Sequence, residues 1–346
     1  MSKFGDLQEK YQDFLVPAVA IYVDGSRLAL DDHILAHIAV DLSIGATCNA
    51  CYFSLENVYE HSSRKIAPAL LDKLKPGAIL EVSLGYSSDL NKVFRGYVWE
   101  TRMDFEEDNL GLAVYGLDAR GLMRENQRRM IYREQKISDI IETILKDYTP
   151  LISAKTIKAD NLEQETNIVQ EGDDLEFLLA VADMRGLLLY VDKDKFVMDK
   201  LTDKVCIEFD WDQCAVSFGV RYLDESITVA GCNPANAKGF LATKPAKQKA
   251  AVNSLLTTKR HIPLGAYLMG DSATKVAESL ANTAIREALW GRLTCTGLPE
   301  AALGHRIKIN NFPFAPLNTG NVFTVVEVSH RFGSEKGFVT TIGITG

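Results

Sequence analysis

The sequence predicts an α+β fold that is mainly β, with two related antiparallel β-modules and a small α/β unit between them. Three observations lead to this prediction. A pattern of a glycine turn followed by alternating strands occurs twice, near residue 77 and near residue 304. The alternation gives way to helical spacing after about residue 122, and strand patterns return from Val205 onward.

The repeated pattern consists of a glycine turn, a short strand, a long returning strand and a closing strand. Its first copy runs through Lys75-Pro76-Gly77, Ile79–Val82, Val93–Val98, Phe105 and Leu110–Tyr115. Its second copy runs through Leu303-Gly304, Ile307–Ile309, Val322–Val326, Phe332 and Phe338–Ile342. Three such chains would place six similar modules around an axis, which suits a trimer that meets a sixfold tube. The alternative is that two unrelated β-meanders share one pattern.

Composition limits the function classes. The 346 residues suffice for two or three domains, and 47% hydrophobic and 24% charged residues are ordinary globular usage. The formal charge of −8 argues against a surface that neutralises nucleic-acid phosphates, so we expect no sequence-specific nucleic-acid partner. The first ten residues lack the apolar segment of a secretory signal, and no later stretch is long enough to span a membrane. We therefore expect cytoplasmic synthesis and no membrane insertion.

The first β-module is expected over residues 1–122. Val16–Tyr22 alternates before the hairpin dipeptide Asp24-Gly25, and residues 34–57 continue the period of two. A short helix is predicted near residues 67–75.

An α/β unit is expected over residues 123–204. Its first helix carries five apolar residues at helical spacing: Ile137, Ile140, Ile141, Ile144 and Leu145. A second helix starts after Asp173 and stops at Gly186, and a hairpin follows with its tip at residues 192–195.

The second β-module is expected to be divided, with its first strands in residues 205–232 and the remainder in residues 292–346. Residues 233–270 are rich in Ala, Lys, Asn and Gly, so we expect a mobile loop there. A helix from about Ser272 to Trp290, ended by Gly291, completes the segment 233–291, which we assign to the lateral unit.

Several short motifs resemble metal-binding or catalytic sites but lack residues that those sites need. Cys48 and Cys51 form only half of a zinc site, and His33 and His37 lie about 13 Å apart on an extended strand. The tip at residues 192–195 lacks the glycine and the distal glutamate of a calcium loop, and the acidic run Asp104–Asp108 is interpreted as a solvated turn. We therefore predict no catalytic residue, no metal ligand and no cofactor. A pair of carboxylates for glycoside hydrolysis remains an alternative, because the distance between two carboxylates is set by the fold and not by the sequence spacing.

The six cysteines are interpreted as reduced core residues, since their density is not that of a disulfide scaffold. They are Cys48, Cys51, Cys206, Cys214, Cys232 and Cys295.

Taken in order, the motifs resemble the late control gene D family of phage tail proteins, which are baseplate hub components of contractile tails and related injection systems. The resemblance covers nearly the whole chain. It rests on these stretches: Lys75-Pro-Gly77, Val93-Phe-Arg-Gly96, Val114–Asp118, Asp174–Leu178, Gly186–Tyr190, Gly297-Leu-Pro299, Gly304, Thr324–His330 and Thr340-Thr341.

The resemblance implies a trimeric ring with two tube-like β-barrels per subunit, in which a lateral α/β domain interrupts the second barrel. Such a hub joins the sixfold tail tube to the threefold spike at the baseplate of a phage tail, a bacteriocin-like particle or a cellular injection system, after synthesis in the bacterial cytoplasm. Its expected partners are further copies of itself, the tail tube protein, the central spike protein and baseplate wedge or tape-measure proteins. Because the chain stops at Gly346, directly after the second barrel, the spike is expected to be a separate protein.

In this interpretation the function is mechanical, and closure of the sheet across subunits removes exposed strand edges. Phe94, Tyr97, Phe323 and Val325 are assigned to the module core rather than to an interface. The alternatives are a tail-associated cell-wall hydrolase, which needs clustered carboxylates, and a surface-binding β-module, which needs an aromatic platform. Trp99, Trp211 and Trp290 are scattered along the sequence.

Overall fold

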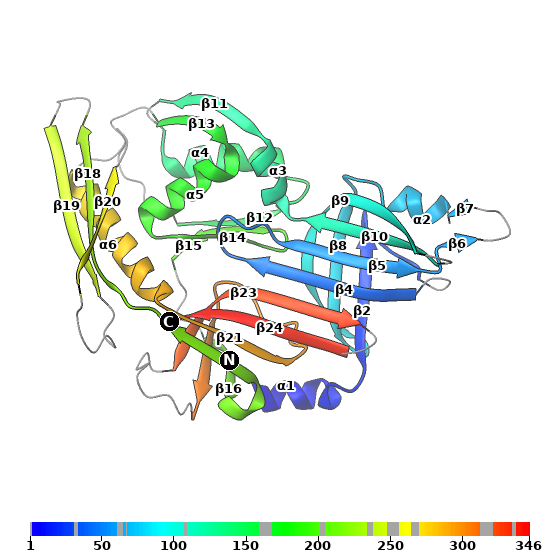
Figure 1. The fold of residues 1–346 in the computed structure, drawn as a ribbon. Coiled ribbons are helices and arrows are strands. Elements are labelled where there is room, and N and C mark those ends of the chain that lie inside the picture. The colour runs from blue at the N-terminus through cyan, green and yellow to red at the C-terminus, as the bar shows by residue number, and fades with distance from the viewer. Residues whose placement is uncertain are drawn as a thin grey trace.

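The computed structural model describes most of the chain in thirteen segments. They are residues 2–30, 34–60, 65–66, 68–106, 109–133, 135–158, 168–200, 205–233, 238–247, 256–263, 270–311, 321–333 and 337–346. The predicted fold class is confirmed: the chain is mainly β, with two antiparallel β-modules and an α/β unit beside them (Figure 1).

The first β-module contains the strands that precede the α/β unit. They are β2 (Pro17–Val23), β3 (Ser26–Arg27), β4 (Ile34–Ser43), β5 (Ala50–Glu56), β8 (Ile79–Tyr86), β9 (Asp89–Glu106) and β10 (Asn109–Leu117). The small elements beside them are β1 (Ser2–Lys3), α1 (Phe4–Lys10), a 3-10 turn (Gln12–Phe14), β6 (Tyr59–Glu60), β7 (Lys65–Ile66) and α2 (Pro68–Lys73). The predicted hairpin at Asp24-Gly25 and the predicted short helix are both present.

The second β-module brings together strands from two separate parts of the chain. They are β16 (Val205–Asp210), β17 (Ala215–Val220), β21 (Leu289–Thr296), β22 (Arg306–Asn310), β23 (Val322–Gly333) and β24 (Gly337–Thr345), with a 3-10 turn (Trp211–Gln213) before β17. The two modules are continuous with each other, because β4 pairs with β23 within one 14-stranded sheet.

The internal repeat extends to individual hydrogen bonds. Gly77 N donates to Val98 O at 2.7 Å and Val98 N to Ala78 O at 2.8 Å. In the second module Gly304 N donates to Val325 O at 3.0 Å and Val325 N to His305 O at 2.8 Å. Residues 77, 78 and 98 therefore correspond to residues 304, 305 and 325.

The two modules also share a β-bulge. The pairing of β9 with β10 skips Trp99, and the pairing of β23 with β24 skips Val326, which is the corresponding residue. Bulges are specific features of a strand rather than defects, so two bulges at matching positions argue strongly for duplication. One difference remains at the sheet margin, where β2 is antiparallel to β8 but β16 is parallel to β22.

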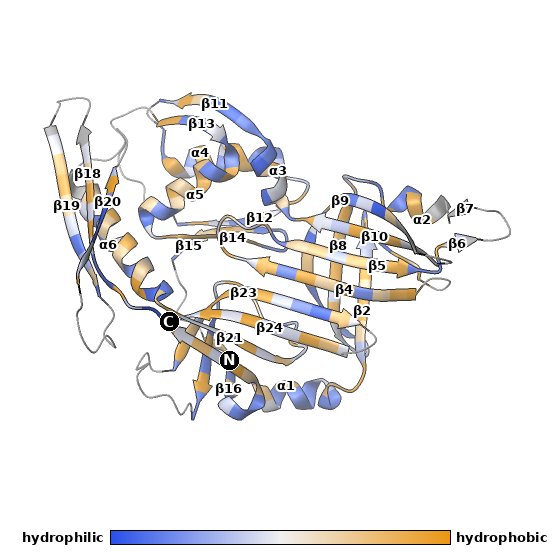
Figure 2. Cartoon of the chain, in the orientation of Figure 1, coloured by the Kyte–Doolittle hydropathy of each residue, from blue (hydrophilic) through white to orange (hydrophobic). Residues whose placement is uncertain are grey.

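One hydrophobic core serves both modules. Its fully buried members include Phe53 and Leu80 of the first module and Ile309, Phe323 and Ile342 of the second. Alternating orange and blue along the central strands in Figure 2 reflects side chains directed in turn to the core and away from it.

The α/β unit forms a second core above the modules (Figure 1). Its elements are α3 (Ala119–Glu125), β11 (Gln127–Tyr132), α4 (Ile137–Leu145), a 3-10 turn (Lys146–Tyr148), β12 (Ala154–Ile157), β13 (Ile168–Asp173), α5 (Asp174–Arg185), β14 (Leu188–Asp192) and β15 (Lys195–Asp199). The predicted apolar face of α4 is buried. Asp173 accepts a hydrogen bond from Glu176 N at the start of α5, and Gly186 ends that helix with φ 63°.

A third layer corrects the prediction for residues 233–270. Where we expected an irregular loop, β18 (Asp224–Asn233), β19 (Lys238–Lys247) and β20 (Thr258–Pro263) form a three-stranded sheet against α6 (Gly270–Glu287). The strand at residues 226–230 therefore belongs to this layer and not to the second β-module. Residues 234–237, 248–255 and 264–269 lie outside the described residues.

The predicted end of the long helix was wrong. The helix α6 stops at Glu287, and Leu289–Thr296 continues as strand β21. Gly291 pairs with Phe218 and Ile344 in the sheet, where a Cβ atom would lie 2.7 Å from the Phe218 ring. This glycine therefore permits close packing and does not cap a helix. In the described part of the chain, no helix combines the length and apolar character needed to cross a membrane.

Substitutions at the repeated glycines should differ in cost. Gly77 has φ 92° and open space around it, whereas Gly304 has φ 72° and a Cβ there would lie 2.6 Å from Tyr190 Oη. We expect Gly77→Ala to cost about 1–2 kcal/mol from backbone strain alone, and Gly304→Ala to cost more because Tyr190 must also move. Thermal unfolding of both variants measures this, and an equal or reversed order would contradict the geometry.

Candidate assembly surfaces

The seam between the two modules is the central structural contact of the molecule. Strand β4 pairs antiparallel with β23 from Ser43 opposite Glu327 to His37 opposite Gly333, and Ile44 N extends the pairing to Val326 O at 3.1 Å. We call this pairing the module junction. It satisfies the backbone groups of two strands that would otherwise be sheet edges.

The junction has an apolar inner face. Val40 and Leu42 on β4 and Val328 on β23 are buried in the shared core. On the outer face, Arg331 pairs with Asp41 at 2.8 Å, and Ser329 Oγ donates to the same carboxylate at 2.8 Å. This ion pair is half-exposed, so it contributes to register more than to stability.

His330 is a buried polar residue of the junction. Its Nδ1 lies 2.9 Å from Thr340 Oγ1, and its ring packs against Phe338. Burial, with the nearby charges of Arg331 and Lys193, lowers the pKa of His330 to about 3. The imidazole is therefore neutral at physiological pH and acts as a packed core group.

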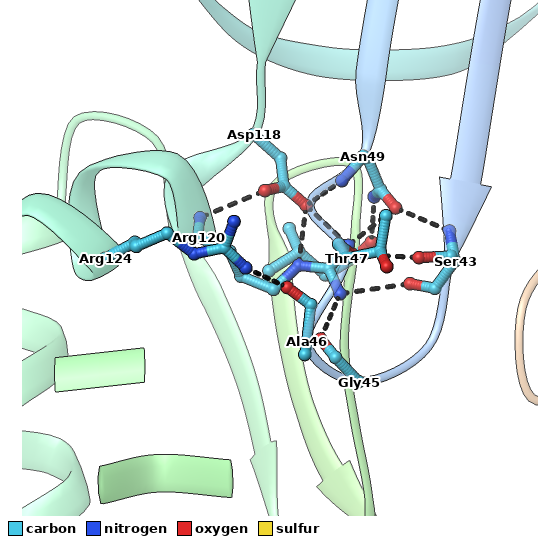
Figure 3. A network of polar contacts seen from close by, with 9 residues as sticks. Ser43, Gly45, Ala46, Thr47, Asn49, Asp118, Arg120 and Arg124 are labelled. Atoms are coloured by element: carbon cyan, nitrogen blue, oxygen red, sulfur yellow. Dashed lines mark hydrogen bonds and ion pairs between the residues drawn. The ribbon is translucent and has the colours of Figure 1, made fainter. Parts of the chain in front are cut away.

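A buried ion pair holds the loop that follows β4 (Figure 3). Arg120 and Asp118 are fully buried and lie 2.8 Å apart. The guanidinium also donates to the carbonyl oxygens of Ser43 (3.0 Å) and Gly45 (2.9 Å) and to Asn49 Oδ1 (2.6 Å). Arg120 Nε also donates to Asp118 Oδ2 at 2.9 Å, so the guanidinium makes four hydrogen bonds besides its 2.8 Å ion-pair contact with Asp118.

This network ties the junction to the α/β unit. Asn49 Nδ2 donates to Val191 O at 2.7 Å, and Gly45 N donates to Leu189 O at 2.8 Å, so both contacts reach β14. The loop between β4 and β5 is thereby fixed from both sides. Asp118 also caps α3, since its side chain accepts a hydrogen bond from Arg120 N.

A second set of contacts joins the modules at their outer ends. Tyr86 donates to Gly297 O at 2.9 Å, and Tyr11 of the N-terminal segment donates to Glu300. Lys10 bridges Glu300 (3.0 Å) and Asp89 (3.3 Å). Burial, with hydrogen bonding to Glu300, raises the pKa of Tyr11, which keeps the phenol protonated.

The residues assigned to the core in the sequence analysis are core residues. Phe94, Phe323 and Val325 are buried in the core shared by the modules. Tyr97 is also buried, but it packs in the core of the α/β unit and not in the module core. Residues 192–195 form the predicted hairpin tip between β14 and β15.

The cysteine prediction holds in part. No disulfide links the five cysteines that the structure describes; Cys51 and Cys295 are buried, whereas Cys48, Cys206 and Cys214 are only half-buried. Cys232 has no described side chain. Within the described residues, no group of three or more His, Cys, Asp or Glu side chains gathers as a metal site. His33 and residues 107–108 of the acidic run lie outside the described residues.

A polar cavity of about 300 Å³ lies between α5, α6 and the loop after β4. Asp183, Glu287 and Arg286 are among its lining residues. Burial, with the charge of Glu287, raises the pKa of Asp183, and burial lowers the pKa of Arg286. The cavity thus lies where the α/β unit and the third layer meet, and Ile44 and Gly45, at the end of the module junction, also line it.

The sequence reasoning missed the role of Asp118, Arg120 and Asn49. The only local signal was the capping residue Asp118 two positions before an arginine. Asn49 lies 71 residues from Arg120 in the chain, so no spacing rule could have paired them.

Comparison with protein families places the chain. Residues 16–223 match the family model described as the Alg8 N-terminal domain. The chain belongs to the Alg8 N-terminal domain family. The matched part begins one residue before β2 and ends one residue before β18. It therefore spans the first module, the α/β unit and the first strands of the second module. No curated protein matches the sequence.

Solved structures share this fold across almost the whole chain. The 43 kDa tail protein of prophage MuSo2 from Shewanella oneidensis has a TM-score of 0.70 at 15% identity, covering 95% of this chain and 98% of that one. A tail protein from Neisseria meningitidis MC58 has a TM-score of 0.68 at 13% identity, covering 95% and 96%. The E. coli c3393 protein, a type VI secretion component described as similar to T4 bacteriophage tail proteins gp27 and gp5, has a TM-score of 0.62 at 11% identity, covering 94% and 76%. At these identities the likeness is one of fold, and this member of the Alg8 N-terminal domain family has the fold of phage tail proteins.

Loss of the buried arginine should destabilise the chain strongly. Arg120→Met leaves the Asp118 carboxylate buried without a counter-charge, and we expect a loss of about 3–5 kcal/mol in the free energy of unfolding. Arg124→Ala is the matched control, because Arg124 is exposed and bonds the neighbouring Ala46 carbonyl; its cost should stay below about 1 kcal/mol. Denaturant unfolding compares the two, and similar losses would contradict the role given to Arg120.

Proposed function

We propose that this chain is a structural, non-enzymatic baseplate hub of a contractile phage tail or a phage-tail-like injection particle. In this role it forms a homotrimeric ring that joins the sixfold tail tube to the threefold spike. The proposal favours the late control gene D family of hubs as the source of this chain's role. Hubs of that kind serve phages, bacteriocin-like particles and cellular injection systems.

The observation that carries the proposal is the duplicated module together with the junction between its copies. A chain with two equivalent modules can present six similar faces when three copies surround an axis, while keeping threefold symmetry on its opposite side. The shared glycine turns and the matching bulges at Trp99 and Val326 support the equivalence. The continuous strand pairing across the module junction supports a role in bearing load.

The proposed partners follow from this geometry. They are further copies of the chain, the tail tube protein on the six-module face, the central spike protein and baseplate wedge or tape-measure proteins. The tail-protein fold supports incorporation into a tail, since proteins with this fold include two named tail proteins and a type VI secretion component.

We propose a division of the chain that follows these roles. Residues 1–122 form the first tube-like module, and residues 205–223 with 289–346 form the second. Residues 123–204 form the lateral unit, to which the layer of β18–β20 and α6 is added in place of a loop.

Electron microscopy of the purified chain tests the hub directly. We expect class averages of a threefold ring with an axial opening and six inner lobes, because each subunit contributes two equivalent modules. Compact monomers at all concentrations, and also in the presence of the tube and spike proteins, would contradict the proposal.

A further inference from the structure

The sheet contains one continuous run of eight strands with two unpaired margins. The run follows the order β9, β10, β5, β4, β23, β24, β21 and β17. Two edges of this run have no partner among the described strands. One is the side of β17 that faces away from β21, and the other is the side of β9 that faces away from β10, in the half of β9 after Val98. The module junction lies in the middle of this run.

The internal repeat relates these open edges to the junction. Strand β9 corresponds to β23, as the shared bulge shows, so Glu100 corresponds to Glu327. Gly116 of β10 pairs with Val98 and Cys51 as Ile344 of β24 pairs with Val325 and Gly291, so β5 corresponds to β21 and Ser54 to Thr294. Strand β17 then corresponds to β4, because Ala215 pairs with Thr294 as His37 pairs with Ser54. The two open edges are thus the duplicates of the two edges that meet at the junction.

We propose that β17 of one copy pairs antiparallel with β9 of the next copy and repeats the module junction between chains. The register follows from the junction itself. Ser43 opposite Glu327 becomes Arg221 opposite Glu100, and Val40 opposite His330 becomes Phe218 opposite Met103. This inference rests on the proposed ring and names the surface that closes it.

The exposure of matching positions supports the pairing. Leu42 is buried at the junction, whereas the corresponding Val220 is 44% exposed. His330 is fully buried, whereas the corresponding Met103 is 45% exposed. Apolar side chains therefore lie uncovered at the positions that the junction buries, and a second copy would cover them.

Two aromatic residues lie just beyond the paired positions, and they match the residues at the end of the module junction. Ile44 and Val326 meet at the end of the junction, and they correspond to Tyr222 and Trp99. Tyr222 is 45% exposed and Trp99 is 53% exposed. The inter-chain pairing would bring these two large rings together and remove both from solvent.

Charge also favours the register. Glu100 and Arg221 would face each other directly, and no ion pair within the described residues involves either side chain. Opposite charges on paired positions stabilise an antiparallel pair, and like charges disfavour a wrong register. Because the two edges differ, the contact is head-to-tail and builds a ring when the rotation closes.

Cysteine cross-linking tests the register in the full chain. Residues that face each other across antiparallel strands lie within disulfide reach. Under mild oxidation, the double variant Glu100→Cys/Arg221→Cys should give covalent multimers on a non-reducing gel, ending at the number of copies in the ring. Each single variant should stay monomeric, and a mixture of the two single variants should give dimers.

Two matched controls define the result. Ser43→Cys/Glu327→Cys places the same pair at the junction and should form an intrachain disulfide. Glu100→Cys/Ser217→Cys shifts one partner by four residues, about 13 Å along the strand, and should not cross-link. As a second test without cysteines, Glu100→Arg should reduce ring formation at least tenfold in sedimentation, and adding Arg221→Glu should restore it.

The outcomes separate this inference from the hub. Rings by microscopy without Glu100–Arg221 cross-links, or with cross-links from the shifted pair, would overturn the pairing and leave the hub standing. Cross-linked open chains without rings would support the pairing and count against the closed hub. Absence of both cross-links and rings, also in the presence of the tube and spike proteins, would overturn both.

Discussion

The antiparallel pairing of β4 with β23 is the contact on which the other features of this molecule depend. It turns two sheets into one, and it lets a single hydrophobic core run beneath both modules. A sheet edge carries backbone donors and acceptors that need partners, and each module has two different edges to satisfy. The chain satisfies one edge of each module internally. The remaining two edges are those that the proposed ring would pair.

The loop at the end of the junction is held by neighbours that are themselves buried and hydrogen-bonded. Arg120 places its charge against Asp118 and fills its remaining donors with carbonyl groups of the loop after β4. A buried pair of this kind gains little net stability over apolar packing, but its geometry is demanding. It therefore serves mainly to fix where the loop and the α/β unit lie relative to the strands.

Local sequence patterns predicted the features that depend on local physics. The alternation of the strands, the glycine turns, the apolar face of α4 and the cap at Asp173 were all readable. The strands at 238–247 and 258–263 were not, because many of their residues are small or charged and their partner β18 lies elsewhere in the chain. The break at residue 288 was also missed, since Leu289 continues the helical spacing and only pairing with β17 and β24 makes it a strand. The repeat was visible in sequence, but the pairing of β4 with β23 and the Arg120 network depend on contacts distant in the chain.

Amide hydrogen exchange on assembled and dissociated chains tests the central claim most directly, because it reads backbone hydrogen bonds at each edge. The account predicts slow exchange for residues 37–43 and 327–333 in both states. Within residues 100–106 and 215–220, it predicts that the alternate amides that point away from β10 and β21 exchange quickly in the dissociated chain and slow together upon assembly. Unchanged exchange at 215–220 in assembled rings would contradict the account, since the ring would then close through other surfaces.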